Sequence, residues 1–304
     1  MLASARGHFH AGALRSQSID LRRYATYALP VYVAQLIAML GGIEAAKIIV
    51  SRQFSIETVA QFGFCAMVTM TVQRYLPTVL LMGLLRPLFA TVMHSENPRQ
   101  RLDFLFSVVV KLNIFVLVPM IGVAFADGND LISLASSGKI LDRSGILASL
   151  LVYVAIQSIR TANNLVMVSI EDGVRTLFSL GTGTAAFLVC ALSMEMGGTT
   201  GLIAILIGSD LISISIMRQR IRRSGQTVQF PLTAIGKLVA SGIIGTVAAI
   251  GAYGMISSQW MLHPFAGPII VGCIYLTCAW ALKPFTANER NAINRLLPVP
   301  LFVW

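Results

Sequence analysis

The sequence predicts an all-α integral membrane protein, a polytopic helix bundle with about eight transmembrane helices. Of its 304 residues, 56% are hydrophobic and only 12% are charged, and the mean hydropathy is +0.76. Water-soluble domains usually carry about 25% charged residues, so these charges are too few to cover the surface of a soluble protein. The apolar residues also form runs of the roughly 20 residues that a helix needs to cross a bilayer.

Uninterrupted apolar stretches place the expected spans in chain order. They are residues 25–50, 60–86, 102–126, 146–168, 174–195, 201–217, 233–256 and 264–282. The second span contains Pro77, which predicts a kink or a strong tilt. The seventh carries Ser241, Gly245 and Ala249 at a spacing typical of closely packed helices.

These spans divide the chain into five parts. We expect an N-terminal segment (1–24), a six-helix lobe (25–217), a basic loop (218–232), two additional transmembrane helices (233–282) and a C-terminal amphipathic tail (283–304). For the tail two alternatives remain open. It is either a short amphipathic helix on the membrane surface, with Arg290 and Arg295 near lipid headgroups, or a disordered segment.

The Lys and Arg residues are unevenly distributed between the two sides of the predicted membrane. With eight spans both termini lie on one side, which collects most of the basic residues, and the other side has only Arg52, Lys139 and Arg143. Basic loops stay in the cytoplasm, so we expect a multi-pass protein of the cell inner (cytoplasmic) membrane with both termini cytoplasmic. The net charge of +10 then reflects orientation, and no nucleic-acid partner is expected.

No metal, cofactor or catalytic site is predicted. The four cysteines lie in apolar runs without CxxC or Cys/His spacing, so we interpret them as small buried apolar residues. The histidines lie outside the predicted spans.

Basic residues also fall inside predicted spans: Lys47, Arg74, Lys111 and Arg160. An ionisable side chain at the bilayer centre costs about 2.5–3.5 kcal/mol, so it usually faces a cavity or a partner. Lys47 lies near a span end, where its side chain can reach the interface. The other three lie deeper, and we expect them to face the interior of the bundle.

Helical spacing places polar side chains in stripes beside these bases. The two stripes are Gln157, Arg160 and Asn164 on the fourth span, and Thr71, Arg74 and Thr78 on the second. Interior bases without matching acids favour an anionic substrate group such as a phosphate or pyrophosphate. The candidate residues for binding an anionic headgroup are therefore Arg74, Lys111, Arg160, Gln157 and Asn164.

The alternative is that these side chains only hold helices together, bonded to backbone carbonyls or to acids within the membrane. Glu44 and Asp210 are the acids that lie within the spans and away from the span ends. They are weaker candidates for ion coupling, and Glu44 and Lys47 at i, i+3 can simply neutralise each other.

Several segments together resemble a known family of membrane transporters. The segments are LRRYATYALPVYVAQLIAMLGG, SIETVAQFGFCAMV, RPLFATVMHSENPRQRLDFL, VPMIGVAFADGNDLISL, SIEDGVRTLF, GGTTGLIAILIGSDL and RQRIRR. In this order they resemble the C-terminal lobe of polysaccharide (lipid-linked oligosaccharide) flippases of the multidrug/oligosaccharidyl-lipid/polysaccharide exporter superfamily. The resemblance runs from Leu21 to Arg223 and is weaker beyond.

The resemblance implies one lobe, plus extra helices, of a two-lobed alternating-access exporter. Members move lipid-pyrophosphate-linked oligosaccharide from the cytoplasmic to the outer leaflet, so membrane lipid and this lipid-linked glycan are the implied partners. The segment before Leu21 resembles the linker that follows a first lobe. The chain is then a truncated product, half of a split transporter, or a protein that needs a separate N-terminal lobe. The matched motifs are structural, and no substrate residue is carried over from them.

Three other functions remain open. A membrane enzyme of glycan assembly would need a base or a metal near the membrane surface, and no paired carboxylates suggest one. A non-transporting partner in a glycan assembly complex fits a lone lobe. A drug exporter of the same superfamily usually depends on membrane carboxylates, which are fewer here than the embedded bases.

Overall fold

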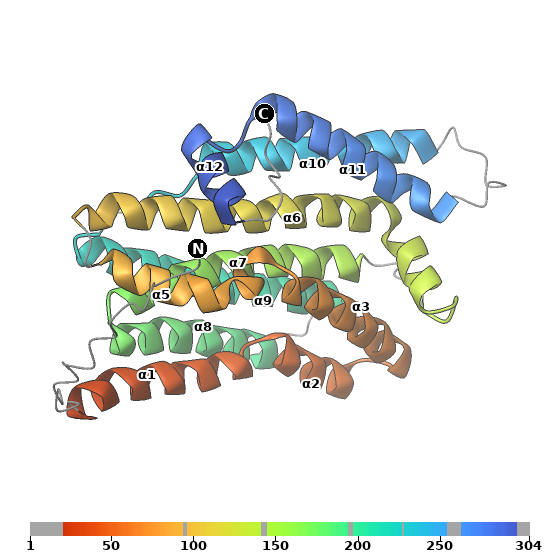
Figure 1. Cartoon of the computed structure of the whole chain (residues 1–304). Coiled ribbons are helices and arrows are strands. Elements are labelled where there is room, and N and C mark those ends of the chain that lie inside the picture. Colours follow the sequence, from red (N-terminus) through yellow and green to blue (C-terminus); the bar gives the residue numbers. More distant parts are fainter. Residues whose placement is uncertain are drawn as a thin grey trace, which may run out of the picture.

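The computed structural model is an all-α helix bundle, which confirms the predicted fold class (Figure 1). It describes residues 21–93, 96–140, 145–193, 197–226, 228–253 and 263–296. Within these residues, six segments are long and apolar enough to cross a membrane: Ala28–Gln53, Pro98–Ala135, Ile146–Ser169, Gly173–Leu192, Gly198–Arg223 and Leu232–Ala252. They correspond to six of the eight predicted spans.

The two remaining predicted spans, 60–86 and 264–282, are interrupted or shorter. The first is divided among α3 (Ile56–Arg74), α4 (Pro77–Leu80) and α5 (Met82–Val92). The second is α11 (His263–Leu282). The predicted span 25–50 is also divided, into α1 (Leu21–Leu40) and α2 (Ile43–Gln53).

The other helices follow the predicted order. They are α6 (Pro98–Ala135), α7 (Ile146–Ser169), α8 (Gly173–Ser193), α9 (Gly198–Arg223), α10 (Leu232–Tyr253) and α12 (Ala287–Leu296). Helix α6 bends at Asp127, where the backbone leaves helical geometry (φ −132°, ψ 15°). This bend falls one residue after the predicted end of the span 102–126.

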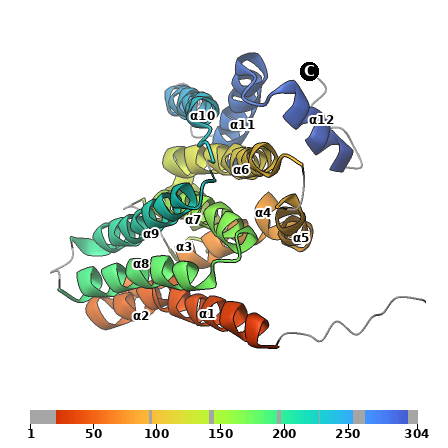
Figure 2. The same ribbon diagram turned by 90° about the vertical axis from the view of Figure 1, so that its left-hand side faces the viewer.

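The helices lie in layers (Figures 1 and 2). Helices α1, α2 and α8 form one side, α7 and α9 lie in the middle, and α6 separates them from α10, α11 and α12. Helix α7 is the most enclosed of the six spanning segments. It packs against α3, α5, α6, α8 and α9.

Close helix contacts depend on small residues, as the spacing on the seventh span predicts. Ser241 and Ala249 are fully buried, and a Cβ on Gly245 would lie 3.1 Å from the backbone oxygen of Val271 in α11. Between α8 and α9 the approach is closer still, because a Cβ on Gly183 would lie 2.9 Å from the Ser209 oxygen. These backbones are near enough that larger side chains do not fit.

The α6 N-terminus and the α9 C-terminus lie at the same end of the bundle. The backbone N–H of Gln229, just after α9, donates to Asp103 of α6 at 2.6 Å. Arg99 and Arg101 of α6 therefore lie at the same end as the basic run that closes α9. We call this the basic end of the bundle.

The predicted tail contains a helix, α12, which supports the helical alternative over a disordered one. Phe285 and Ile293 are buried and pack against Val108 of α6. Most of the predicted segment 1–24, residues 254–256 of the seventh span and residues 297–304 lie outside the described residues.

Candidate functional site

The predicted second span, 60–86, is broken inside the bundle. Helix α3 ends at Arg74, Tyr75 leaves helical geometry, Leu76 is extended (φ −64°, ψ 141°), and α4 begins at Pro77. Proline has no N–H to continue a helix, and its ring excludes helical geometry at the preceding residue. The sequence prediction of a kink at Pro77 is confirmed, in the stronger form of a break.

Asn113 of α6 closes this break. Its side-chain oxygen accepts a hydrogen bond from the backbone N–H of Thr78 at 3.2 Å, and its amide donates to the Thr78 hydroxyl. Asn113 is fully buried. The first N–H groups of a helix have no partner within it and are costly to leave unpaired in lipid, so Asn113 serves as a cap from a distant helix.

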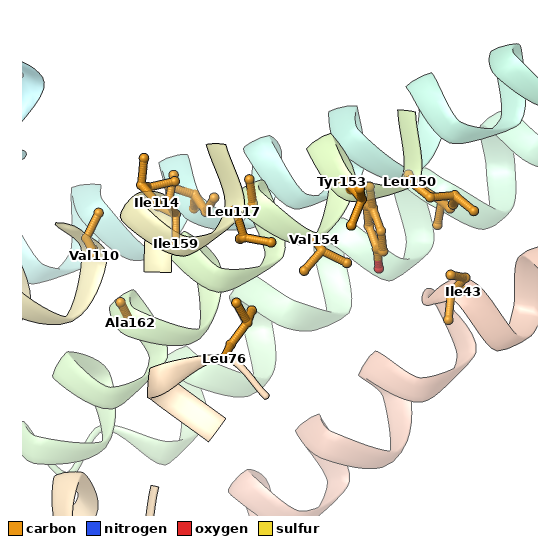
Figure 3. Packing of buried hydrophobic residues seen from close by; sticks show 14 of the residues in the cluster. Ile43, Leu76, Val110, Ile114, Leu117, Leu150, Tyr153, Val154, Ile159 and Ala162 are labelled. Atoms are coloured by element: carbon orange, nitrogen blue, oxygen red, sulfur yellow. The ribbon is translucent and has the colours of Figure 1, made fainter. Parts of the chain in front are cut away.

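The break packs directly on α7. Figure 3 shows Leu76 pointing toward Leu117 of α6, with Ala162 and Val154 of α7 on either side. All four side chains are buried. The apolar residue of the break is thus fixed between two spanning helices.

A small cleft opens beside the break. Its polar lining comes from Gln73 and Thr78 on one side and from Gln157, Ser158 and Thr161 of α7 on the other. The Oε1 atom of Gln157 is buried without a hydrogen-bond partner, and so is Oδ1 of Asn164, two turns further along α7. Such acceptors usually find a donor, which a water or a ligand hydroxyl would supply. We call this site the α7 cleft.

Arg160, on the same helix, is paired with an acid. Its Nη1 atom lies 3.0 Å from Oδ1 of Asp210 in α9, and the Asp210 side chain is almost fully buried. Oδ2 of Asp210 and the hydroxyl of Tyr153, both buried, have no hydrogen-bond partner. This charged group joins α7 to α9 within the bundle.

Lys111 is also paired, with an acid that the sequence analysis did not consider. Its Nζ atom donates to both carboxylate oxygens of Glu289 in α12 at 2.8 Å, and Ser107 donates to the same carboxylate at 3.0 Å. Lys111 and Glu289 are 5% and 4% exposed, so the pair is sealed from solvent.

Glu289 also caps its own helix. Its Oε2 atom accepts from the backbone N–H of Thr286 at 2.8 Å, and the Thr286 hydroxyl accepts from the N–H of Glu289 at 3.4 Å. This reciprocal arrangement is a capping box. Burial alone would raise the pKa of Glu289, but hydrogen bonds from Lys111, Thr286 and Ser107 outweigh it and hold the pKa below its ordinary value.

Lys111 lies near the basic end, not at the middle of the bundle. The Tyr275 hydroxyl of α11 donates to the backbone oxygen of Phe115 at 2.9 Å. Helix α11 ends at Leu282, which is seven residues, or about 10 Å along the helix axis, beyond Tyr275. Helix α6 runs antiparallel to α11, so Leu282 is about level with Val108, which lies seven residues before Phe115 in α6. Lys111 lies roughly one turn deeper than that apolar boundary.

One sequence-based premise needs correction. The premise that the interior bases lack acids is wrong, since Lys111 and Arg160 each have a carboxylate. Arg74 has an exposed side chain, and its neighbour Gln73 lines the cleft. The break ends α3 at Arg74, so the stripe spacing does not continue to Thr78.

The weaker candidates separate clearly. Glu44 pairs with Lys47 at 3.0 Å, as the i, i+3 spacing allows, and its side chain is 60% exposed. Asp210 is buried and bonded to Arg160. Among the described residues no cluster of His, Cys, Asp and Glu side chains could hold a metal ion.

The structure also adds residues that the sequence analysis missed: Asn113, Tyr153, Ser107 and Glu289. A signal existed for Glu289, because Thr286 and Glu289 have the spacing of a capping box. Asn113 lies two residues after Lys111 in an apolar span, where an amide needs a partner.

Comparisons of the chain with protein-family models, with curated proteins and with solved structures find no match.

Proposed function

We propose that the chain is a transporter lobe that moves an anionic lipid-linked glycan across the membrane. The observation that carries the proposal is the break in the predicted second span, which lies beside the α7 cleft. Non-helical backbone at membrane depth is tolerated where it is buried in protein or lines a cavity, and discontinuous helices commonly form the binding sites of transporters.

The polar atoms in and near the α7 cleft can pair with a glycan once the cleft widens, since it now has room for about one water molecule. Gln157 in the cleft and Asn164, two turns further along α7, present buried oxygens that lack donors, and Thr161 and Gln73 add further polar groups to the cleft. Sugar hydroxyls would donate to such oxygens while the lipid chain remained in the bilayer. The choice of a lipid-linked glycan follows the sequence resemblance, and the inner membrane and the cytoplasmic termini follow from the distribution of Lys and Arg.

Lys111 fits this proposal as an exchangeable site. It would release Glu289 as a phosphate or pyrophosphate head arrives, because a phosphoryl group offers more acceptor oxygens than one carboxylate. Lys111 then keeps a partner in both states, and Glu289, on a helix at the basic end, would be released toward water.

A transport assay on the reconstituted protein tests the proposal. We would measure the rate at which a fluorescent lipid-diphosphate oligosaccharide becomes accessible to a membrane-impermeant quencher in proteoliposomes. The double variant Gln157→Leu, Thr161→Val should lower the rate by about 30-fold, since each change loses a cleft hydrogen bond of about 1 kcal/mol. Thr182→Val on α8, outside the cleft lining, is the matched control.

The ion pairs favour one other function, that of a non-transporting membrane partner in a glycan assembly complex. Both buried bases are bonded to acids on other helices, as expected if they only hold the bundle together. A correctly inserted wild-type protein that moves lipid-linked glycan no faster than empty liposomes would overturn the transport proposal in favour of this one.

A further inference from the structure

A groove opens at the basic end of the bundle. It lies between α5 and α6 and is lined by Leu88, Thr91, Val92, Arg101, Phe104 and Leu105. Helix α5 runs toward the basic end and α6 runs away from it. Arg101 and Val92 therefore form the shallow part of the groove, and Leu88 and Leu105 form the deeper part.

The polarity of the groove changes with depth. Arg101 is exposed and lies three residues after the start of α6. It is about 10 Å closer to the basic end than the level at which the apolar α11 ends. The deeper walls are apolar. A guanidinium at headgroup level above an apolar channel matches a membrane lipid with an anionic phosphate head.

Arg101 and Lys111 lie on one face of α6. Arg101, Phe104, Val108 and Lys111 follow the i, i+3, i+7, i+10 spacing of a helix face, with the two charges about 15 Å apart along the axis. Phe104 lines the groove and also packs against the Val108 cluster under α12. The groove is thus continuous with the surface that α12 covers, and α5 and α12 lie on the same side of α6 (Figure 2).

We propose that this face of α6 is a binding route for a lipid phosphate, and that α12 is its removable cover. The phosphate binds first at Arg101, and then displaces Glu289 from Lys111. In the structure the Glu289 carboxylate occupies the position on Lys111 that the phosphate takes when α12 moves away.

The contacts of α12 with α6 combine a small apolar cluster with one charged link. The cluster has Val108, Phe285 and Ile293 as its buried members, apart from the main core, with Phe104, Leu112 and Phe115 packed against it. The Glu289 carboxylate accepts from Lys111 and Ser107 of α6. An anion that competes for Lys111 therefore removes the charged link and leaves only the small apolar cluster to hold α12.

This inference takes its substrate class from the proposed function, but its test measures release of α12 and not transport. A cysteine at Ile293, which is 3% exposed, reports release through its reaction with a water-soluble maleimide. The native cysteines are first replaced by Ala, at Cys65, Cys190, Cys273 and Cys278.

The labelling rate is compared in phosphatidylcholine vesicles with and without a polyprenyl diphosphate. We expect slow labelling in neutral vesicles and an increase of about tenfold with the anionic lipid, as a shift of 1.4 kcal/mol in the docking equilibrium gives. Inorganic diphosphate in neutral vesicles should have no such effect, because it lacks the chain that fills the groove.

Variants separate the two steps. Glu289→Gln should label rapidly even in neutral vesicles, and Lys111→Gln should do the same if the first variant folds poorly. Arg101→Gln should label slowly and lose the response to the lipid. The matched control is Arg99→Gln, since Arg99 is an exposed neighbour outside the groove lining and the variant should respond like the wild type.

Three results would overturn the inference. They are equal labelling with and without the anionic lipid, a normal lipid response in Arg101→Gln, and an equal response to inorganic diphosphate. A protein that releases α12 but transports nothing would contradict the proposed function alone. Transport that continues with α12 cross-linked to α6 would contradict this inference alone.

Discussion

The Arg160–Asp210 pair gives a quantitative test of how the bundle handles charge. The perturbation is a double-mutant cycle made of Arg160→Met, Asp210→Leu and the combined variant. Asp210 is 2% exposed, and only its Oδ1 atom has a partner, the Arg160 guanidinium at 3.0 Å. Removing Arg160 therefore leaves a buried carboxylate with no compensating charge.

The magnitude follows from burial. Breaking a buried pair by removing one partner costs about 3–5 kcal/mol, whereas replacing both partners with apolar residues of similar size is often neutral. We expect Arg160→Met to be the more harmful single change, because the Arg160 side chain is 15% exposed and keeps some access to solvent when Asp210 is removed. The double variant should recover most of the loss, which gives a coupling energy of about 3 kcal/mol.

The assay is equilibrium unfolding in mixed micelles, with the free energy of unfolding measured for each variant. The matched control is the Lys47–Glu44 pair, whose Glu44 side chain is 60% exposed and whose coupling should be about 0–1 kcal/mol. If the cost of the double variant equals the sum of the two single costs to within about 0.5 kcal/mol, the pair is not coupled and the reasoning is refuted.

Three other predictions use the same stability assay. Gly183→Ala should destabilise the bundle strongly, because the new Cβ would lie 2.9 Å from a backbone oxygen of α9, whereas Gly181→Ala, with open space, should be tolerated. Asn113→Ala should cost about 1–3 kcal/mol by leaving the buried Thr78 N–H without its acceptor, and an unchanged stability would argue against the cap. On acidification, α12 should detach as the pH falls through the lowered pKa of Glu289, and the loss of docking should begin below the ordinary glutamate pKa of about 4.3. The maleimide labelling described above measures this detachment, and the Glu289→Gln variant should show no such step.

The fold class was predictable because the bilayer imposes a simple rule on composition. Runs such as 102–126 and 146–168 satisfy that rule without knowledge of any other helix, and both are helices in the structure. The break at Pro77 was predictable for a similar reason, since the effect of proline on its own backbone is local. Where the position or pairing of a side chain depended on a neighbouring helix, it could not be predicted from the sequence alone.

The site illustrates that limit. Lys111 and Glu289 are 178 residues apart in the chain, and Asn113 and Thr78 are 35 apart. Neither pairing follows from helical spacing, which relates residues only within one helix. Gln157 of the predicted stripe on α7 lines the cleft, but the residues opposite it depend on where α3 ends.

Paired bases are compatible with transport only if their partners are exchangeable. A lysine that is already paired with a carboxylate binds an incoming phosphate only under one condition. The lysine–phosphate pair must be more stable than the lysine–carboxylate pair by more than the free energy needed to move the carboxylate away. Glu289 meets this condition better than Asp210, because it lies on a short terminal helix at the basic end, whereas Asp210 lies within a spanning helix. The freed Glu289 would reach water and the freed Asp210 would not, so the first exchange should take place at Lys111, and Arg160 should keep its acid unless α7 and α9 separate.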